Sequence, residues 1–230
     1  MDAPSETVHQ PAPIVFILDC DNTLLDNDRV KADMDTALKQ LLGEPLTARF
    51  WQVYEQVREQ NGTVDLPQTF TAFRADLTDD ATLEKTREAI MDFPFASRLF
   101  PATTATLRYL HTQGLPVIVS DGDSVYQPRK IELSGLADAV SGQWIVYTHK
   151  EDHLDEVMAR WPGSFYVMVD DKARILAETK RRAPERFVTI HIRKGHYADN
   201  VFDPPPDLGL DDIGDLQTLD MAALRQYLHS

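Results

Sequence analysis

The sequence has little of several features that define special classes of protein. It holds one cysteine, Cys20, so it cannot form an internal disulfide, and a disulfide-stabilised fold is excluded. No stretch comes near the roughly 18 consecutive apolar residues of a transmembrane helix. Basic residues are few, with 23 Lys and Arg against 37 Asp and Glu, and the net charge is −14. Because such a surface repels phosphate backbones and anionic lipids, we expect neither nucleic acid nor a membrane as a partner.

The start of the chain also lacks the pattern of a targeting signal. The segment MDAPSETVHQPAP is polar, with no basic stretch followed by an apolar one, and we interpret it as a loose lead-in. Together with the single cysteine, this favours a cytoplasmic location. The length of 230 residues and the apolar content of 43% fit one core domain with an insertion, as a monomer or as a homodimer.

Short apolar runs alternate with helical patterns through most of the chain. Continuous apolar runs predict strands buried on both faces, at residues 14–18, 115–120, 143–148, 164–171 and 186–193. Apolar residues at helical spacing predict helices at residues 100–113, 124–134, 150–161, 172–183 and 219–229. This alternation predicts parallel β-α-β units and therefore an α/β fold with a doubly wound, Rossmann-like parallel sheet.

One long segment interrupts this alternation. Between residues 28 and 94 no strand is predicted, and apolar residues such as Val30 and Met34 recur at helical spacing. Four consecutive helices are expected there. The segment is too long for a crossover and too regular for a loop. We therefore expect a core domain formed by residues 1–27 and 95–230, with an all-helical domain of residues 28–94 inserted into it.

Acidic and hydroxyl side chains follow three of the predicted strands. Asp19 and Asp21 follow the first strand, Ser120 ends the second, and Asp170 and Asp171 end the fourth. In a doubly wound sheet, ligands bind beyond the carboxyl ends of the strands, so these residues are expected to meet there. Four carboxylates in one crevice remain ionised only beside a cation, and oxygen ligands suit a hard cation such as Mg²⁺.

The same residues belong to four motifs that resemble those of a known family. These are DCDNT at residues 19–23, VIVSDG at 117–122, Lys150, and VMVDDK at 167–172. Their order and spacing resemble the four motifs of the haloacid dehalogenase-like (HAD) hydrolase superfamily, and the resemblance spans residues 14 to about 190. The long helical insertion lies between the first and second motifs, which resembles the group with a helical cap over the active site.

The resemblance implies a role for each matched position. Asp19 would be the nucleophile that forms an aspartyl-phosphate, and Asp21 would protonate the leaving oxygen and then activate water. Ser120 would hydrogen-bond a phosphoryl oxygen, and Lys150 would steady the phosphate and Asp19. Further phosphate contacts would come from the chain around the nucleophile and after the second strand, at Cys20, Asp21, Asp121 and Gly122.

The resemblance also implies a Mg²⁺ site, and two details stay open. The ion would be held by Asp19, the backbone carbonyl of Asp21, and either Asp170 or Asp171. The register of the fourth motif favours Asp171. The identity of the lysine is the second open detail, because Lys130 is a rival to Lys150 as the group that steadies the phosphate.

Asp21 favours one reaction within the superfamily. A carboxylate two residues after the nucleophile can protonate a leaving oxygen, whereas a halide leaves without protonation. We therefore expect a Mg²⁺-dependent phosphatase that hydrolyses a small phosphorylated metabolite. Three alternatives remain open: a hydrolytic 2-haloacid dehalogenase, a phosphotransferase or mutase, and a binding protein that keeps the fold without turnover.

Overall fold

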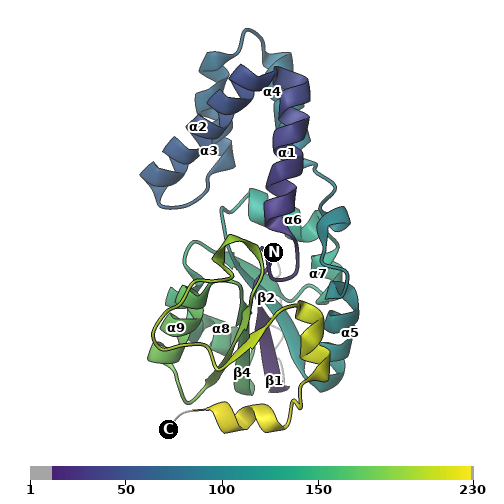
Figure 1. The fold of residues 1–230 in the computed structure, drawn as a ribbon, viewed down its shortest axis with the longest axis vertical. Helices are drawn as coiled ribbons and strands as arrows, with labels where there is room; N and C mark the ends of the chain where they lie inside the picture. The colour runs from purple at the N-terminus through teal and green to yellow at the C-terminus, as the bar shows by residue number, and fades with distance from the viewer. Residues whose placement is uncertain (1–11, 229–230) are drawn as a thin grey trace, which may run out of the picture.

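A six-stranded sheet forms the centre of the protein, and the computed structural model describes residues 12–228. All neighbouring strands are parallel, and their order is β3-β2-β1-β4-β5-β6. The strands are β1 (Ala12–Leu18), β2 (Leu115–Asp121), β3 (Trp144–Tyr147), β4 (Gly163–Asp170), β5 (Phe187–Ile192) and β6 (Leu208–Leu210). This arrangement confirms the predicted doubly wound α/β fold (Figure 1).

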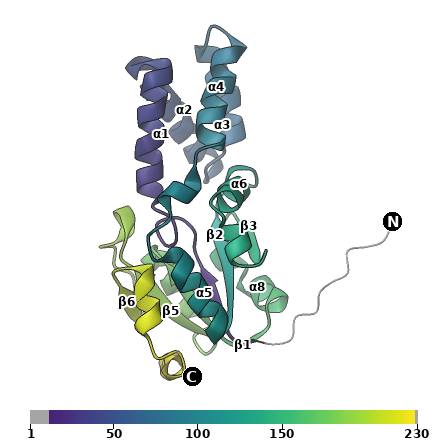
Figure 2. The same cartoon turned by 90° about the vertical axis from the view of Figure 1, so that its right-hand side faces the viewer.

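Helices cover both faces of the sheet. Alternate side chains of β1 point into two separate cores. Phe16 and Leu18 lie in the first core, and Val15 and Ile17 lie in the second. The first core is covered by α5 (Thr103–Gln113), α6 (Tyr126–Leu133) and α7 (Leu136–Ala139), and the second by α8 (Leu154–Arg160) and α9 (Ala173–Arg182). Figure 1 labels all five helices, and Figure 2 shows α5 and α8 on different sides of the sheet. A strand covered on both faces has no side that faces water, which explains the unbroken apolar run of β1.

The carboxyl ends of the three central strands meet at one edge of the sheet. β1 lies between β2 and β4. Leu18, the last residue of β1, is level with Ile118 of β2 and with Val169 of β4. The polar residues that follow these positions in the three strands therefore come together at this edge, as predicted from the sequence.

Four helices stand beyond this edge: α1 (Asn27–Leu42), α2 (Glu44–Asn61), α3 (Leu66–Phe73) and α4 (Asp80–Met91). They form a helical bundle at the top of the view, apart from the helices that cover the sheet (Figure 1). The described chain has no strand between Asn27 and Met91, which agrees with the predicted all-helical insertion. We propose that this bundle is a cap domain of residues 28–94, and that residues 1–27 and 95–230 form the core domain.

The helical bundle has an aromatic core of its own. Phe50 of α2 is fully buried. The centre of its ring lies 5.2 Å from the ring of Trp51, 5.2 Å from that of Phe73 and 6.1 Å from that of Phe70. Edge-to-face contacts of this kind add to the free energy that burial of the rings contributes.

The structure differs from the sequence-based prediction in several details. β6 is not predicted, because its three residues are too few to show a pattern. The predicted helix at 219–229 is a short 3₁₀ helix, Ala223–Tyr227, and the one predicted from residue 150 starts as a separate 3₁₀ turn before α8. The predicted lead-in lies almost wholly outside the described residues. No described helix has the length and apolar character needed to cross a bilayer.

Replacing Phe50 with alanine is expected to destabilise the helical bundle. The substitution leaves a cavity between the rings of α2 and α3, and such truncations lower the free energy of unfolding by about 3–5 kcal/mol. Urea denaturation followed by tryptophan fluorescence measures the change. Leu41→Ala, at an exposed position of α1, is the control and should have an effect of less than about 0.5 kcal/mol. Equal effects of the two substitutions would contradict this packing.

Candidate active site

Asp19 stands at the carboxyl end of β1, in the middle of the sheet edge. Its backbone N–H donates to the carbonyl of Val169 (2.9 Å), which extends the pairing of β1 with β4 by one residue. Only 1% of the surface of Asp19 is exposed. The sheet therefore fixes the position of this carboxylate and shields it from water.

The chain turns sharply between β1 and α1. The carbonyl of Cys20 closes the turn by accepting two backbone N–H groups, and Asn22 adopts a positive φ of 57°. The side-chain oxygen of Asn22 accepts from the backbone N–H of Asn27 (3.0 Å), the first residue of α1. This turn leaves the side chain of Asp21 23% exposed. Asp21 therefore faces the space beyond the sheet edge, unlike the buried Asp19.

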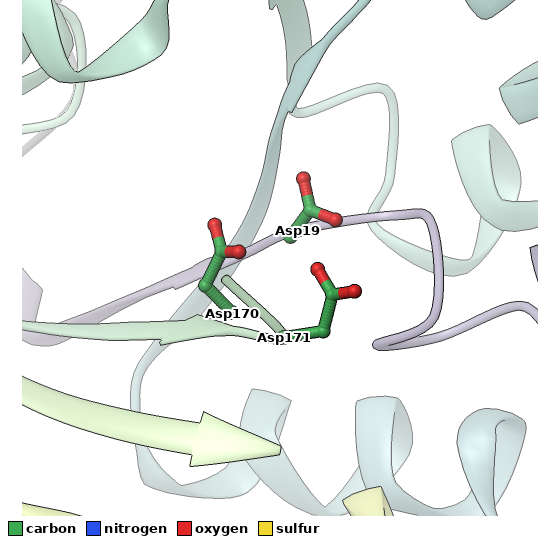
Figure 3. A group of neighbouring side chains, drawn as sticks. All are labelled: Asp19, Asp170 and Asp171. Carbon is green, nitrogen blue, oxygen red and sulfur yellow. The ribbon is translucent and has the colours of Figure 1, made fainter. Parts of the chain in front are cut away.

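Three buried carboxylates cluster at this edge, those of Asp19, Asp170 and Asp171 (Figure 3). One oxygen from each lies within 4.8 Å of the others. Among the described residues, neither oxygen of Asp171 has a hydrogen-bond partner, and nor does Oδ2 of Asp19. Burial, together with the charges of Asp170 and Asp19, raises the pKa of Asp171 to about 9. Such a set of close, unpartnered oxygens fits a hard divalent cation such as Mg²⁺.

The two adjacent acids, Asp170 and Asp171, differ in their contacts. Oδ1 of Asp170 accepts from the backbone N–H of Lys172 (2.8 Å), and Oδ2 forms an ion pair with Nζ of Lys150 (2.6 Å). Burial raises the pKa of Asp170 to about 6, although Lys150 opposes this shift. Since the oxygens of Asp171 have no such partners, Asp171 is the better candidate for direct contact with a metal ion.

Lys150 lies between two of the clustered acids. Its Nζ forms ion pairs with the carboxylates of Asp19 and Asp170 and donates to the carbonyl of Val119 (3.2 Å). Burial by itself lowers the pKa of Lys150, but the charges of Asp170 and Asp19 outweigh that effect and raise it well above the ordinary value. The ammonium group therefore remains charged beside Asp19.

Lys130 of α6 pairs with the second acid of the first motif. Its Nζ lies 2.8 Å and 2.9 Å from the two oxygens of Asp21 and 3.0 Å from the side-chain oxygen of Asn27. The lysine side chain is only 2% exposed. A buried ammonium without an acid beside it is costly, so Lys130 and Asp21 depend on each other. Both lysines are candidates from the sequence, and in the structure each contacts a different acid of the first motif, Lys130 Asp21 and Lys150 Asp19.

A buried glutamine links the second motif to the first. Oγ of Ser120 accepts from Nε2 of Gln127 (2.9 Å), and the same nitrogen lies 3.4 Å from Oδ2 of Asp21. Gly122 makes room for this side chain, since a Cβ at position 122 would lie 2.6 Å from Cβ of Gln127. Sequence reasoning misses Gln127 because it stands among polar residues at the start of a helix, and no motif singles it out.

Two predicted phosphate contacts have hydrogen-bond partners within the core. The backbone N–H of Gly122 donates to the carbonyl of Tyr147 (2.9 Å), so it takes part in the pairing of β2 with β3, and its contact with a phosphate stays a prediction. The carboxylate of Asp121 accepts from the backbone N–H of Lys150 (2.9 Å) and lies 3.7 Å from Nζ of Lys172. Asp121 therefore braces the loop that carries Lys150.

Cys20 separates Asp19 from Asp21 in the sequence but does not join the acidic cluster. Its side chain is fully buried within the apolar core. Burial raises the pKa of the Cys20 thiol well above its ordinary value. Because a buried neutral thiol is unreactive, any contact of this residue with a phosphate would come through its backbone.

Asp21 lines two of the cavities between the helical bundle and the sheet edge. The larger has a volume of about 370 Å³ and is also lined by Asp171 and Lys172 of the core and by Lys31 and Arg58 of the bundle. The smaller, of about 100 Å³, extends from Asp21 toward aromatic side chains of the bundle. A small molecule in these cavities can therefore contact Asp21, whereas Asp19 lies buried behind it and lines neither cavity.

The sequence profile of the haloacid dehalogenase-like hydrolases matches residues 15–176, well over half of the chain. The chain belongs to the haloacid dehalogenase-like (HAD) hydrolases. The matched range contains the three clustered acids, Asp21 and both buried lysines, so the resemblance seen in the four motifs is confirmed. Among curated proteins, none matches the sequence significantly.

Solved structures of other HAD proteins share this fold. One structure, from Burkholderia xenovorans LB400, is provisionally described as a HAD-like hydrolase and is 42% identical in sequence to this chain. The match has a TM-score of 0.85 and covers 93% of this chain and 99% of the Burkholderia chain. An L-2-haloacid dehalogenase from Xanthobacter autotrophicus with chloropropionic acid covalently bound is 17% identical (TM-score 0.58, 90% and 97% covered). A provisionally described HAD hydrolase from Bacillus subtilis bound to magnesium is 15% identical (TM-score 0.60, 91% and 98% covered). The last two similarities show the fold alone.

Replacing Asp171 with asparagine is expected to have opposite effects with and without a metal ion. In EDTA the substitution removes one of three crowded carboxylates, so the melting temperature should rise by a few degrees, as expected for a change of about 1 kcal/mol. Adding Mg²⁺ should then raise the melting temperature of the wild-type protein but not that of Asp171→Asn. The exposed Glu185→Gln is the control and should behave like the wild type. Stabilisation of Asp171→Asn by Mg²⁺ would contradict the assignment.

Proposed function

We propose that this HAD hydrolase is a Mg²⁺-dependent phosphatase that hydrolyses a small phosphomonoester through an aspartyl-phosphate. The observation that carries the proposal is the pair of acids in the first motif, each beside its own buried lysine. Asp19 contacts Lys150 in the acidic cluster, whereas Asp21, paired with Lys130, lines both cavities. A two-step hydrolysis needs two acids in different surroundings, one to attack and one to move protons.

In the first step Asp19 attacks the phosphorus atom of the ester. A bond forms between Asp19 and phosphorus while the bond from phosphorus to the alcohol oxygen breaks, and Asp21 delivers a proton to that oxygen. The ammonium of Lys130, 2.8 Å from Asp21, can supply this proton. Lys150 stays beside Asp19 and stabilises the negative charge of the phosphoryl group.

In the second step water hydrolyses the aspartyl-phosphate. Asp21 accepts a proton from the water as its oxygen bonds to phosphorus, and Asp19 departs as a carboxylate. Inorganic phosphate leaves, and both acids and Lys130 regain their starting protonation. We assign to Ser120, whose Oγ is already oriented by Gln127, a hydrogen bond to a phosphoryl oxygen.

Mg²⁺ is the cation that best suits the acidic cluster. Asp19 and Asp171 would hold it with side-chain oxygens and Asp21 with its backbone carbonyl, while Asp170 orients Lys150. When bound, the ion offsets the charge of the carboxylates and draws negative charge from the phosphoryl oxygens. Magnesium in the Bacillus subtilis relative supports this choice of cation.

Dehalogenation is the main alternative, because one structural relative holds chloropropionic acid covalently. A halide leaves without a proton, so in a dehalogenase the pair of Asp21 and Lys130 would have no task in the first step. The pair and the acidic cluster both favour phosphoryl chemistry. A phosphotransferase would share the first step and differ only in the acceptor. A protein that merely binds a ligand would need neither a nucleophile nor a second acid.

Replacing Asp19 with asparagine should abolish phosphatase activity. Purified wild-type protein is expected to hydrolyse p-nitrophenyl phosphate in Mg²⁺ and to lose the activity in EDTA. Since the amide cannot form the aspartyl-phosphate, Asp19→Asn should lower kcat by about a thousandfold or more. Asp138→Asn, at an exposed position of α7, is the control. Chloride release from 2-chloropropionate in EDTA, without release of phosphate from the ester, would support the dehalogenase instead.

Replacing Asp21 with asparagine should separate the two steps. Nitrophenolate leaves without needing a proton, so the first step should continue, but the second step loses its base. Rapid-mixing kinetics with p-nitrophenyl phosphate should show a burst of about one equivalent of nitrophenolate and then a rate lowered by about 100-fold or more. Mass spectrometry should detect the phosphorylated protein. A linear time course at the wild-type rate would show that Asp21 has no role in either step.

A further inference from the structure

The smaller cavity continues from Asp21 into the helical bundle and has a mostly apolar wall. Side chains that line it include Met34, Trp51, Tyr54, Leu66, Ile90 and Tyr126. Its volume is about 100 Å³. A phosphomonoester with its phosphate at Asp19 and its leaving oxygen at Asp21 would extend its organic part into this space. Such walls favour a compact apolar or aromatic body.

One lysine, Lys31 of α1, lines both this cavity and the larger one. The residue is exposed overall, and within the described chain no carboxylate forms an ion pair with it. Its Nζ lies 5.6 Å from the ring centre of Tyr54. Burial lowers the pKa of Lys31, and Glu55 is the acid that opposes this most, yet Glu55 is itself in an ion pair with Arg58 (2.7 Å). The positive charge of Lys31 is therefore not fully balanced.

The acids on the core side of the smaller cavity do not balance Lys31 either. Each accepts from another group: Asp21 from Lys130, Asp121 from the backbone N–H of Lys150, and Asp123 from the backbone N–H of Tyr126. Oδ2 of Asp123 has no hydrogen-bond partner among the described residues, but none of the three acids forms an ion pair with Lys31. A ligand that carries one negative charge would complete the set of contacts at Lys31.

The position of Lys31 relative to Asp21 limits the size of such a ligand. Lys31 follows Asn27 by four residues on α1, so the two side chains lie on one face, about 5–6 Å apart at their Cβ atoms. Asn27 contacts Lys130 (3.0 Å), which in turn holds Asp21. Lys31 and Asp21 also line the same cavity of about 100 Å³, so a ligand that contacts both must be compact.

We propose that Lys31 binds a carboxylate of the substrate, and that the substrate is a phosphomonoester of a compact, mainly apolar or aromatic carboxylic acid. This inference rests on the proposed phosphatase function and adds the substrate class to it. A carboxylate matches the single charge of Lys31. A second phosphate would instead bring about two negative charges into a cavity whose core wall is acidic.

Two aryl esters of nearly equal shape test this inference, 4-carboxyphenyl phosphate and its uncharged analogue 4-carbamoylphenyl phosphate. Phosphate release by the wild-type protein in Mg²⁺ should give a kcat/KM about tenfold or more higher for the carboxylate, mainly through a lower KM. The carbamoyl group withdraws more electron density and makes the better leaving group. A preference for the carboxylate therefore cannot come from the intrinsic reactivity of the ester.

Variants on one helix locate the source of the preference. Lys31→Met should lower kcat/KM for the carboxylate to that of the carbamoyl ester, and Lys31→Arg should keep most of the preference. Lys39→Met is the matched control on α1, since Lys39 is paired with Asp35 (2.8 Å) instead of lining the cavity. It should retain the wild-type preference.

The outcomes separate this inference from the function on which it rests. Equal kcat/KM for the two esters in the wild type, or a preference that survives Lys31→Met, would overturn the inference and leave the phosphatase proposal standing. If neither aryl ester nor p-nitrophenyl phosphate is hydrolysed, the phosphatase proposal fails, and the substrate class inferred from it fails too.

Discussion

The balance of charge at one edge of the sheet is the constraint on which the rest of the structure depends. Parallel strands end together, and here β1 and β4 bring Asp19, Asp170 and Asp171 into a buried cluster. Carboxylates so close together repel one another strongly when water is excluded. Lys150 compensates two of them, and Asp171 is left without a partner in the described chain. A cation bound between these carboxylates would balance the charge that Lys150 leaves uncompensated.

The two lysines that compensate these charges lie on segments far from β1 in the sequence, and the fold places them beside the acids. Lys150 follows β3, and Lys130 lies on α6, which packs against the sheet. Loss of either ammonium would leave a buried or half-buried carboxylate unpaired, which costs more than the pair contributes. The packing of the apolar helix faces on the sheet therefore also determines where the two ammonium groups lie. No disulfide contributes to this arrangement, since Cys20 is the only cysteine.

Much of this arrangement could be predicted from the sequence, because its signals are local. An apolar run that ends in Asp19 and Asp21 indicates a buried strand with acids at its end, and parallel topology then brings the other strand ends alongside. The contacts of Gln127 and the pairing of Lys130 with Asn27 could not be predicted. Lys130 and Asn27 are separated by 103 positions, so no periodicity or spacing records their contact. The hydrogen bond from the N–H of Gly122 could not be predicted either, because its partner, the carbonyl of Tyr147, lies on another strand.

The contact between Asn27 and Lys130 has a mechanical consequence. Asn27 is the first residue of α1 and the last residue before the proposed cap domain, and Lys130 belongs to a helix that packs on the sheet, so this bond lies at the joint between the bundle and the core. If α1 tilted away from the sheet, the bond would stretch and Lys130 would lose one of the contacts that orient it toward Asp21. In the proposed mechanism, Lys130 would therefore be fully oriented toward Asp21 only while the base of α1 stays in contact with α6.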